Sequence, residues 1–307
     1  MAAVGRPSAS GLIYDVVGPH RLLNASAFQF MASSLVRIVG AVVGGFVVDR
    51  LGVGANYLLI FTAYCGSAST LLPVISPENA PKATDSFIRS VGAGLHYALS
   101  TLHIRQLLIL CSIVEAFGFA YMAMMPVMAR DVLKVGGIGL GYLTAMVGVG
   151  QLIAMLPVAS REDLRDKGTV LVAAVFGFGV FVALFGLSPW FSVSLVIVTL
   201  AGAMGTTYDT TMSTMLMTAA SDHVRGRVLG LYFSTMGFSS FGWLAIGGLA
   251  TVLSMPVALA ISGGIIILSV LRLVPRLHLL KILGAPALSA GKTPYVERRG
   301  RDEPLER

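Results

Sequence analysis

Long apolar runs dominate this sequence and limit the folds that it can adopt. A helix needs about 20 mainly apolar residues to cross a bilayer, and eight runs approach or exceed that length. They cover residues 22–48, 54–75, 106–129, 140–158, 169–187, 191–217, 228–252 and 255–275. Helices satisfy their own backbone hydrogen bonds inside lipid. We therefore expect an all-α fold, a polytopic transmembrane helix bundle of eight spans.

The composition agrees with a lipid environment. Only 12% of the 307 residues are charged and 55% are hydrophobic, whereas soluble domains are about 25% charged. The net charge of +7 does not indicate nucleic-acid binding, which uses a soluble basic face. Cys65 and Cys111 both fall inside apolar runs, without the spacing of a metal site or a disulfide framework. We expect no metal and no cofactor.

The basic residues predict the orientation in the membrane. Of the 22 Lys and Arg residues, Arg50, Arg130 and Lys134 lie on one side of the predicted bundle and Arg37 lies within a run. The other eighteen lie on the opposite side, and cytoplasmic loops are the ones enriched in Lys and Arg. We therefore expect a multi-pass protein of the inner (plasma) membrane with both termini in the cytoplasm.

The polar segments between and after the runs also have distinct patterns. Residues 77–105 contain an apolar stripe at helical spacing (Phe87, Val91, Leu95, Leu99), which predicts an amphipathic helix on the membrane surface. Residues 276–307 are polar and charged, and we expect this tail to be disordered.

Three ionisable residues lie within the runs: Arg37, Glu115 and Asp209. A charge at the bilayer centre costs roughly 2.5–3.5 kcal/mol on insertion scales, so such groups face a cavity or each other. One interpretation is a structural pair between Arg37 and either carboxylate. The other is a proton or substrate site at Glu115 or Asp209, and the sequence leaves both open.

Small and polar residues add further candidates. Gly40 and Gly44 are spaced as in a GxxxG face, which lets helix backbones approach closely, either as static packing or as a sliding interface. Gln151 is polar within an apolar run, which indicates either an interhelical hydrogen bond or a contact with a cavity; we expect the hydrogen bond. Tyr121 and Met125 belong to a Met-rich stretch; methionines suit either core packing or an adaptable apolar pocket.

Five stretches resemble segments of one known family. Residues 40–45, Gly-Ala-Val-Val-Gly-Gly, resemble the antiporter motif G-P-x-x-G-G of a fifth helix, with Ala41 in place of its Pro. Residues 92–108, 125–133 and 139–150 are similar to segments around a seventh and an eighth helix. The stretch 224–228 resembles the loop leading into an eleventh helix. The chain thus resembles a major facilitator superfamily transporter of the drug- and siderophore-exporter branch, also called transmembrane secretion effectors.

This resemblance implies a domain organisation. Residues 1–76 would be the remnant of an N-terminally truncated first half with two spans, and 77–105 the cytoplasmic linker between the halves. Residues 106–275 would form the complete C-terminal half of six helices, followed by the cytoplasmic tail 276–307. The first span would pack against the run 140–158 through the Gly40/Gly44 face.

The resemblance also implies site residues, because the family's seventh and tenth helices line its cavity. These helices correspond to the runs 106–129 and 191–217. The proton or substrate cavity would then include Glu115, Tyr121, Met125, Gln151 and Asp209. The antiporter-like motif would comprise Arg37, Gly40, Gly44 and Gly45, and the cytoplasmic loop motif Arg225, Gly226 and Arg227.

The expected function is secondary active transport: proton-coupled efflux of small amphipathic molecules by a monomeric protein in the bilayer. Alternatives are a membrane subunit of another transport system or a membrane-embedded enzyme. The chain lacks a Walker A motif, so we do not expect it to hydrolyse ATP. Its five histidines lie in or beside the polar links, which disfavours a catalytic cluster in the membrane. We therefore expect no enzyme activity.

Overall fold

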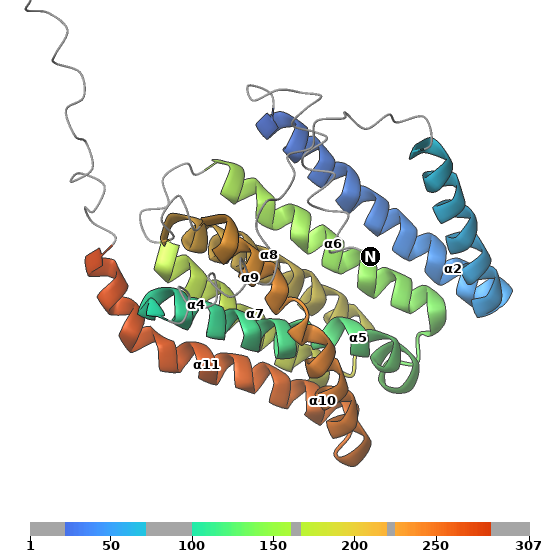
Figure 1. The fold of residues 1–307 in the computed structure, drawn as a ribbon. Coiled ribbons are helices and arrows are strands. Elements are labelled where there is room, and N and C mark those ends of the chain that lie inside the picture. Colours follow the sequence, from blue (N-terminus) through green and yellow to red (C-terminus); the bar gives the residue numbers. More distant parts are fainter. Residues whose placement is uncertain (1–21, 72–99, 161–166, 220–224, 284–307) are drawn as a thin grey trace, which may run out of the picture.

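The computed structural model describes residues 22–71, 100–160, 167–219 and 225–283, and all of its regular structure is helical (Figure 1). Seven helices in this part of the chain are long and apolar enough to cross a membrane. The expected all-helical, multi-spanning fold is thereby confirmed. The predicted surface helix around residues 87–99 and the tail beyond residue 283 lie outside the described residues.

The predicted runs from residue 106 onward each coincide with one spanning segment. The third predicted run is a chain of four helical pieces, and the seventh is divided into two. In order, the helices are α2 (Leu22–Leu71), α4 (Leu102–Ile113), η2 (Val114–Gly118), α5 (Ala120–Val127), η3 (Met128–Val132), α6 (Gly136–Ser160), α7 (Lys167–Leu187), α8 (Phe191–Ala219), α9 (Arg225–Thr235), α10 (Phe238–Val252) and α11 (Met255–Leu283).

Helix α2 contains the first two predicted runs and turns back on itself between them. Gly52 has φ 83° and ψ 171°, a backbone conformation that glycine adopts without steric cost. Figure 1 shows the two arms of α2 running in different directions from this break. The apolar part of α2 has 38 residues, about 57 Å of helix at about 1.5 Å per residue, well over one bilayer core. The count of eight spans therefore remains a prediction, which requires that the two arms of α2 on either side of Gly52 each cross the membrane.

The remaining helices pack around an apolar core. Helix α6 lies between α2 and α8, and α7 lies between α8 and α11. At the centre the ring of Tyr121 makes edge contacts with Phe178 and Phe185, with centroids 6.0 and 6.3 Å apart. All three side chains are fully buried.

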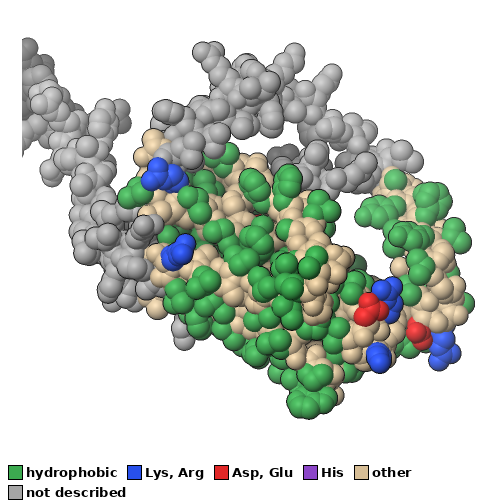
Figure 2. Space-filling view, turned by 90° about the horizontal axis from the view of Figure 1, so that it is seen from below, with side chains coloured by type: hydrophobic (Ala, Val, Ile, Leu, Met, Phe, Trp, Pro, Cys, Tyr) green, Lys and Arg blue, Asp and Glu red, His purple; other side chains and the backbone are tan. Residues whose placement is uncertain are grey.

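The outer surface is also apolar, as expected where lipid is the solvent. Figure 2 shows hydrophobic side chains over much of the visible face, whereas the charged side chains of the described residues gather toward its ends. On the second arm of α2, large apolar side chains such as Tyr57, Leu58, Phe61 and Tyr64 are exposed.

Small residues allow the helix backbones of the bundle to approach closely. A Cβ atom added at Gly150 of α6 would collide with the carbonyl of Thr199 on α8, and one at Gly202 with the carbonyl of Val147. Helices α7 and α11 meet in the same way, because a Cβ at Gly179 would lie 2.9 Å from the carbonyl oxygen of Gly263.

The predicted contact between the first span and α6 exists, but the predicted face is wrong. A Cβ at Gly40 would meet nothing within 4 Å, and one at Gly44 only the side chain of Asn56 at 3.5 Å. In contrast, a Cβ at Gly45 would lie 2.5 Å from the Gly137 carbonyl oxygen. A Cβ at Gly141 would lie 2.7 Å from the carbonyl oxygen of Ala41.

Two small-residue pairs spaced four apart therefore form this interface, one from each helix: Ala41 and Gly45 of α2, and Gly137 and Gly141 of α6. Helix α2 therefore contacts α6 through positions one residue later in the sequence (41 and 45) than the predicted positions (40 and 44). Alanine at position 41 is small enough for the close approach, which the GxxxG pattern alone does not reveal.

Candidate functional site

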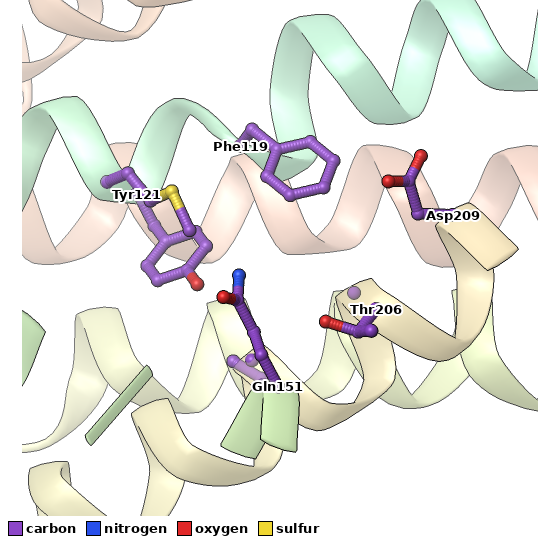
Figure 3. A pocket seen from close by; sticks show the side chains of 9 residues that line it. Phe119, Tyr121, Gln151, Thr206 and Asp209 are labelled. Atoms are coloured by element: carbon purple, nitrogen blue, oxygen red, sulfur yellow. The ribbon is translucent and has the colours of Figure 1, made fainter. Parts of the chain in front are cut away.

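A small polar cavity lies within the spanning region between α5, α6 and α8 (Figure 3). Its volume is about 40 Å³, enough for one water molecule or one functional group of a ligand. It is lined by Phe119, Tyr121, Met122, Gln151, Ala201, Gly202, Gly205, Thr206 and Asp209. The structure thus brings together three of the five predicted cavity residues: Tyr121, Gln151 and Asp209.

An irregular helical turn precedes the first of these lining residues. Segment η2 is π-helical, with the amide of Phe119 bonded to the carbonyl of Val114 five residues earlier (3.3 Å). Such turns widen a helix locally and are frequent at functional sites. This turn shifts the register of the helix directly before Phe119 and Tyr121, which face the cavity.

Neighbouring helices hold this turn in place. The hydroxyl of Ser262 on α11 donates to the Phe117 carbonyl at 2.5 Å, a backbone acceptor of the irregular turn. Helix α10 approaches from another side, where a Cβ at Gly242 would collide with the carbonyl of Ala116. The turn is therefore specified by contacts from distant parts of the chain.

Gln151 has a defined orientation in the cavity wall. Its Oε1 atom accepts a hydrogen bond from Nη1 of Arg37 on α2 at 3.1 Å, which confirms the interhelical bond expected for Gln151. This hydrogen bond is the basis for assigning the oxygen and nitrogen atoms of the Gln151 amide. In Figure 3 this amide is turned toward the hydroxyl of Tyr121.

The Tyr121 hydroxyl is fully buried and has no hydrogen-bond partner among the described residues. A buried hydroxyl without a partner loses its hydration, and no hydrogen bond with another described residue offsets this loss. Tyr121 and Gln151 thus place a hydroxyl and an amide side chain in the wall of the cavity.

Asp209 borders the other end of the cavity in Figure 3. Its carboxylate also accepts a hydrogen bond from the hydroxyl of Tyr232 on α9. The suggested ion pair of Arg37 with Glu115 or Asp209 does not occur between the described residues. Their one ion pair joins Arg130 to Asp131 at 2.6 Å, and Arg37 bonds Gln151 instead.

Glu115 and Met125 do not line the cavity. Glu115 lies on η2, is only 6% exposed and is within electrostatic reach of Asp209. Met125 is buried between α5 and α6, where the Thr144 hydroxyl lies 3.6 Å from its sulfur atom. Glu115 is therefore part of a polar region beside the cavity, while Met125 contributes to packing.

The two predicted sequence motifs lie elsewhere. Arg37 and Gly45 of the antiporter-like motif face α6, whereas Gly40 and Gly44 do not. The loop motif begins α9 at Arg225, and a Cβ at Gly226 would meet nothing within 4 Å. The side chains of Arg225 and Arg227 are outside the described part of the structure.

Sequence reasoning missed a second polar cluster, next to Glu115. The thiol of Cys111 on α4 and the hydroxyl of Thr235 on α9 are 3.0 Å apart. Tyr208 of α8 and Tyr232 of α9 are buried nearby. Tyr232 and Thr235 are three residues apart on one helix, a spacing that places them on the same face and that the sequence displays. No group of three His, Cys, Asp or Glu in the described ranges could hold a metal ion.

Comparison with known proteins gives matches over nearly the whole chain. The model of the family described as transmembrane secretion effector matches residues 1–291. The enterobactin exporter EntS of Shigella flexneri is 26% identical over 290 residues, which cover 93% of this chain and 68% of that protein. The enterobactin exporter EntS of Escherichia coli O139:H28 is 24% identical over 276 residues, covering 88% and 65%. The chain spans about two thirds of the length of these relatives.

Proposed function

Because the chain belongs to the transmembrane secretion effector family of the major facilitator superfamily, a family of transporters and not of enzymes, we propose that it is a secondary active exporter. The expected cargo is a small amphipathic molecule. The names of the relatives, which are exporters, support export as the direction of transport. Of the alternatives from the sequence, family membership excludes the enzyme.

The observation that carries this proposal is the polar cavity within the spanning helices. Tyr121, Gln151, Thr206 and Asp209 come from three different segments and surround one space, in a region where isolated polar groups are costly. Substrate sites of secondary transporters lie near the middle of the bilayer, between parts that move against one another. The cavity is much smaller than the roughly 300–1,000 Å³ of ligand pockets. We take it as one subsite of a larger binding region, in a closed conformation.

We further propose that export is coupled to protons through Glu115 and Asp209. Two carboxylates within electrostatic reach of each other repel when both are charged, and the repulsion is stronger where water is scarce. A proton on either one removes this repulsion. Coupling would follow if access of water to the pair alternates between the two sides of the membrane.

The proposed setting is the inner membrane, with eight spans, both termini in the cytoplasm and a monomeric protein. The distribution of Lys and Arg supports this orientation. In this setting the interface formed by Ala41, Gly45, Gly137 and Gly141 would be the surface on which α2 and α6 move against one another.

Proton release during export tests the proposal. The protein would be expressed from its own gene, and inside-out membrane vesicles would be prepared and energised so that protons accumulate inside them. A pH-sensitive dye inside the vesicles would then report the internal pH while amphipathic compounds are added one at a time. We expect at least one compound to release protons from these vesicles but not from vesicles with Glu115→Gln. If no compound releases protons, or if Glu115→Gln responds like the parent protein, proton-coupled export through this carboxylate is wrong.

A further inference from the structure

Two buried polar contacts connect α9 to its neighbours. The hydroxyl of Tyr232 donates to the carboxylate of Asp209 on α8, and the hydroxyl of Thr235 lies 3.0 Å from the thiol of Cys111 on α4. Tyr232 and Thr235 are 2% and 6% exposed. Since they are three residues apart, one face of α9 makes both contacts.

A break in the helix separates α9 from α10. The helix ends at Thr235, and Met236 and Gly237 separate it from α10 with turn-type hydrogen bonds from Met236 N to Phe233 O (3.3 Å) and from Gly237 N to Ser234 O (3.0 Å). Short i→i+3 turns and glycines are common points of bending in helices. Toward the start of α9, a Cβ at Gly226 or Gly230 would meet nothing within 4 Å. Val228 on the same helix is fully buried, so a tilt of α9 about this break would move this apolar side chain together with the two polar contacts.

The contact of Tyr232 connects α9 to the cavity, because Asp209 takes part in both. Its carboxylate lines the cavity and also accepts the Tyr232 hydrogen bond. Among the described side chains, the other titratable groups around this contact include Glu115 from η2, Cys111 from α4 and Tyr208 from α8. A proton or ligand group that engages Oδ1 of Asp209 would compete with Tyr232 for that oxygen atom.

We propose that Tyr232 and Thr235 are positioning residues that form a latch, which holds α9 against α4 and α8 and opens when Asp209 takes another partner. The latch makes α9 the element that responds to occupancy of the cavity. The role of the latch in transport rests on the proposed export function. The closed and open positions of α9 can nevertheless be measured without any transport.

Native Cys111 reports directly on the latch. It is fully buried beside Thr235, and the chain has one other cysteine, Cys65, which is exposed. In a Cys65→Ser background, the rate of Cys111 modification by N-ethylmaleimide measures how often α9 leaves α4. A hydrogen bond to a charged group contributes roughly 1.5–3 kcal/mol, so we expect Tyr232→Phe to raise this rate by at least about tenfold. Thr235→Val should raise it as well, and Thr235→Ser, which keeps the hydroxyl, should not.

Matched controls separate the latch from general loosening. Tyr142→Phe removes the hydroxyl of an exposed tyrosine on α6 and should leave the rate unchanged. Ser269→Ala removes a hydroxyl contact within α11, with the Ile266 carbonyl at 2.7 Å, without touching α9, and its rate should also stay near that of the parent. Unfolding temperatures of all variants would identify any variant that does not fold. If Tyr232→Phe does not fold, Asp209→Asn tests the same contact from its other side.

The outcomes are distinct. Faster modification in Tyr232→Phe and Thr235→Val, with both controls unchanged, supports the latch even if no substrate is ever found. An unchanged rate in folded Tyr232→Phe, or an equal increase in Ser269→Ala, overturns the latch and leaves the proposed export function standing.

Discussion

Arg37 on α2 donates a hydrogen bond to Gln151 on α6, and so connects the interface of these two helices to the wall of the cavity. The bond holds the Gln151 amide in a defined orientation in the cavity wall. It also gives the charged side chain of Arg37, which lies in an apolar stretch of α2, a polar partner.

A double-mutant cycle tests the strength of this bond. Arg37→Met and Gln151→Leu should each lower the stability of the protein, and the double variant should lose less than the sum of the two. We expect a coupling free energy of about 0.5–1.5 kcal/mol, measured from denaturant or thermal unfolding in detergent. Additive effects would mean that the bond contributes nothing to stability.

The face of α2 that packs on α6 can be tested with a matched pair of neighbouring glycines. Gly45→Leu places a side chain where a Cβ already lies 2.5 Å from the Gly137 carbonyl oxygen, whereas Gly44→Leu points toward free space near Asn56. Overpacking costs typically about 1–3 kcal/mol, so Gly45→Leu should lower the unfolding temperature and Gly44→Leu should not. The reverse order would restore the GxxxG face that the sequence suggested.

The irregular turn before the cavity depends on Ser262. Ser262→Ala removes the donor to the Phe117 carbonyl, and an unpaired buried backbone acceptor costs about 1–3 kcal/mol. Ser269→Ala on the same helix is the control, because its hydroxyl bonds only a carbonyl of its own helix, that of Ile266 at 2.7 Å. We expect a lower free energy of unfolding for Ser262→Ala than for Ser269→Ala; equal values would contradict the role of Ser262.

The orientation is testable with reporter fusions. Alkaline phosphatase, active only outside the cytoplasm, should be active when fused after Lys134 and inactive when fused after residue 163 or 280. The reason is the position of three Lys and Arg residues on one side and eighteen on the other. An active fusion after residue 280 would place the C-terminus outside and contradict the charge-based topology.

Much of the fold could be predicted from the sequence, because the thickness of the bilayer sets the length of the apolar run that each spanning helix needs. The pairing of α2 with α6 also followed from small residues and from family resemblance. The contacting face did not, because Gly40/Gly44 and Ala41/Gly45 are both small pairs with the same spacing. A difference of one residue rotates a helix by about 100° at 3.6 residues per turn.

The site was predicted in part. Tyr121 and Asp209 converge as the family's cavity-lining helices imply, and Gln151 joins them from the neighbouring helix α6. The π-helical turn at residues 114–118 could not be predicted, because it is held by Ser262 and Gly242, far away in the sequence. The partner of Asp209 was missed for a similar reason: Tyr232 reaches it only once α9 has docked on α8.

Chemical blocking of the cavity tests the central claim, that export passes this cavity, most directly. Thr206 lines the cavity, and Thr206→Cys in a Cys65→Ser background would place a thiol there. Efflux of a compound that releases protons from the vesicles would be measured before and after modification by a small methanethiosulfonate reagent, with Cys65→Ser alone as the control. We predict that modification stops efflux in Thr206→Cys only, and that the exported compound slows the modification. Undiminished efflux after complete modification of Thr206→Cys would contradict the account.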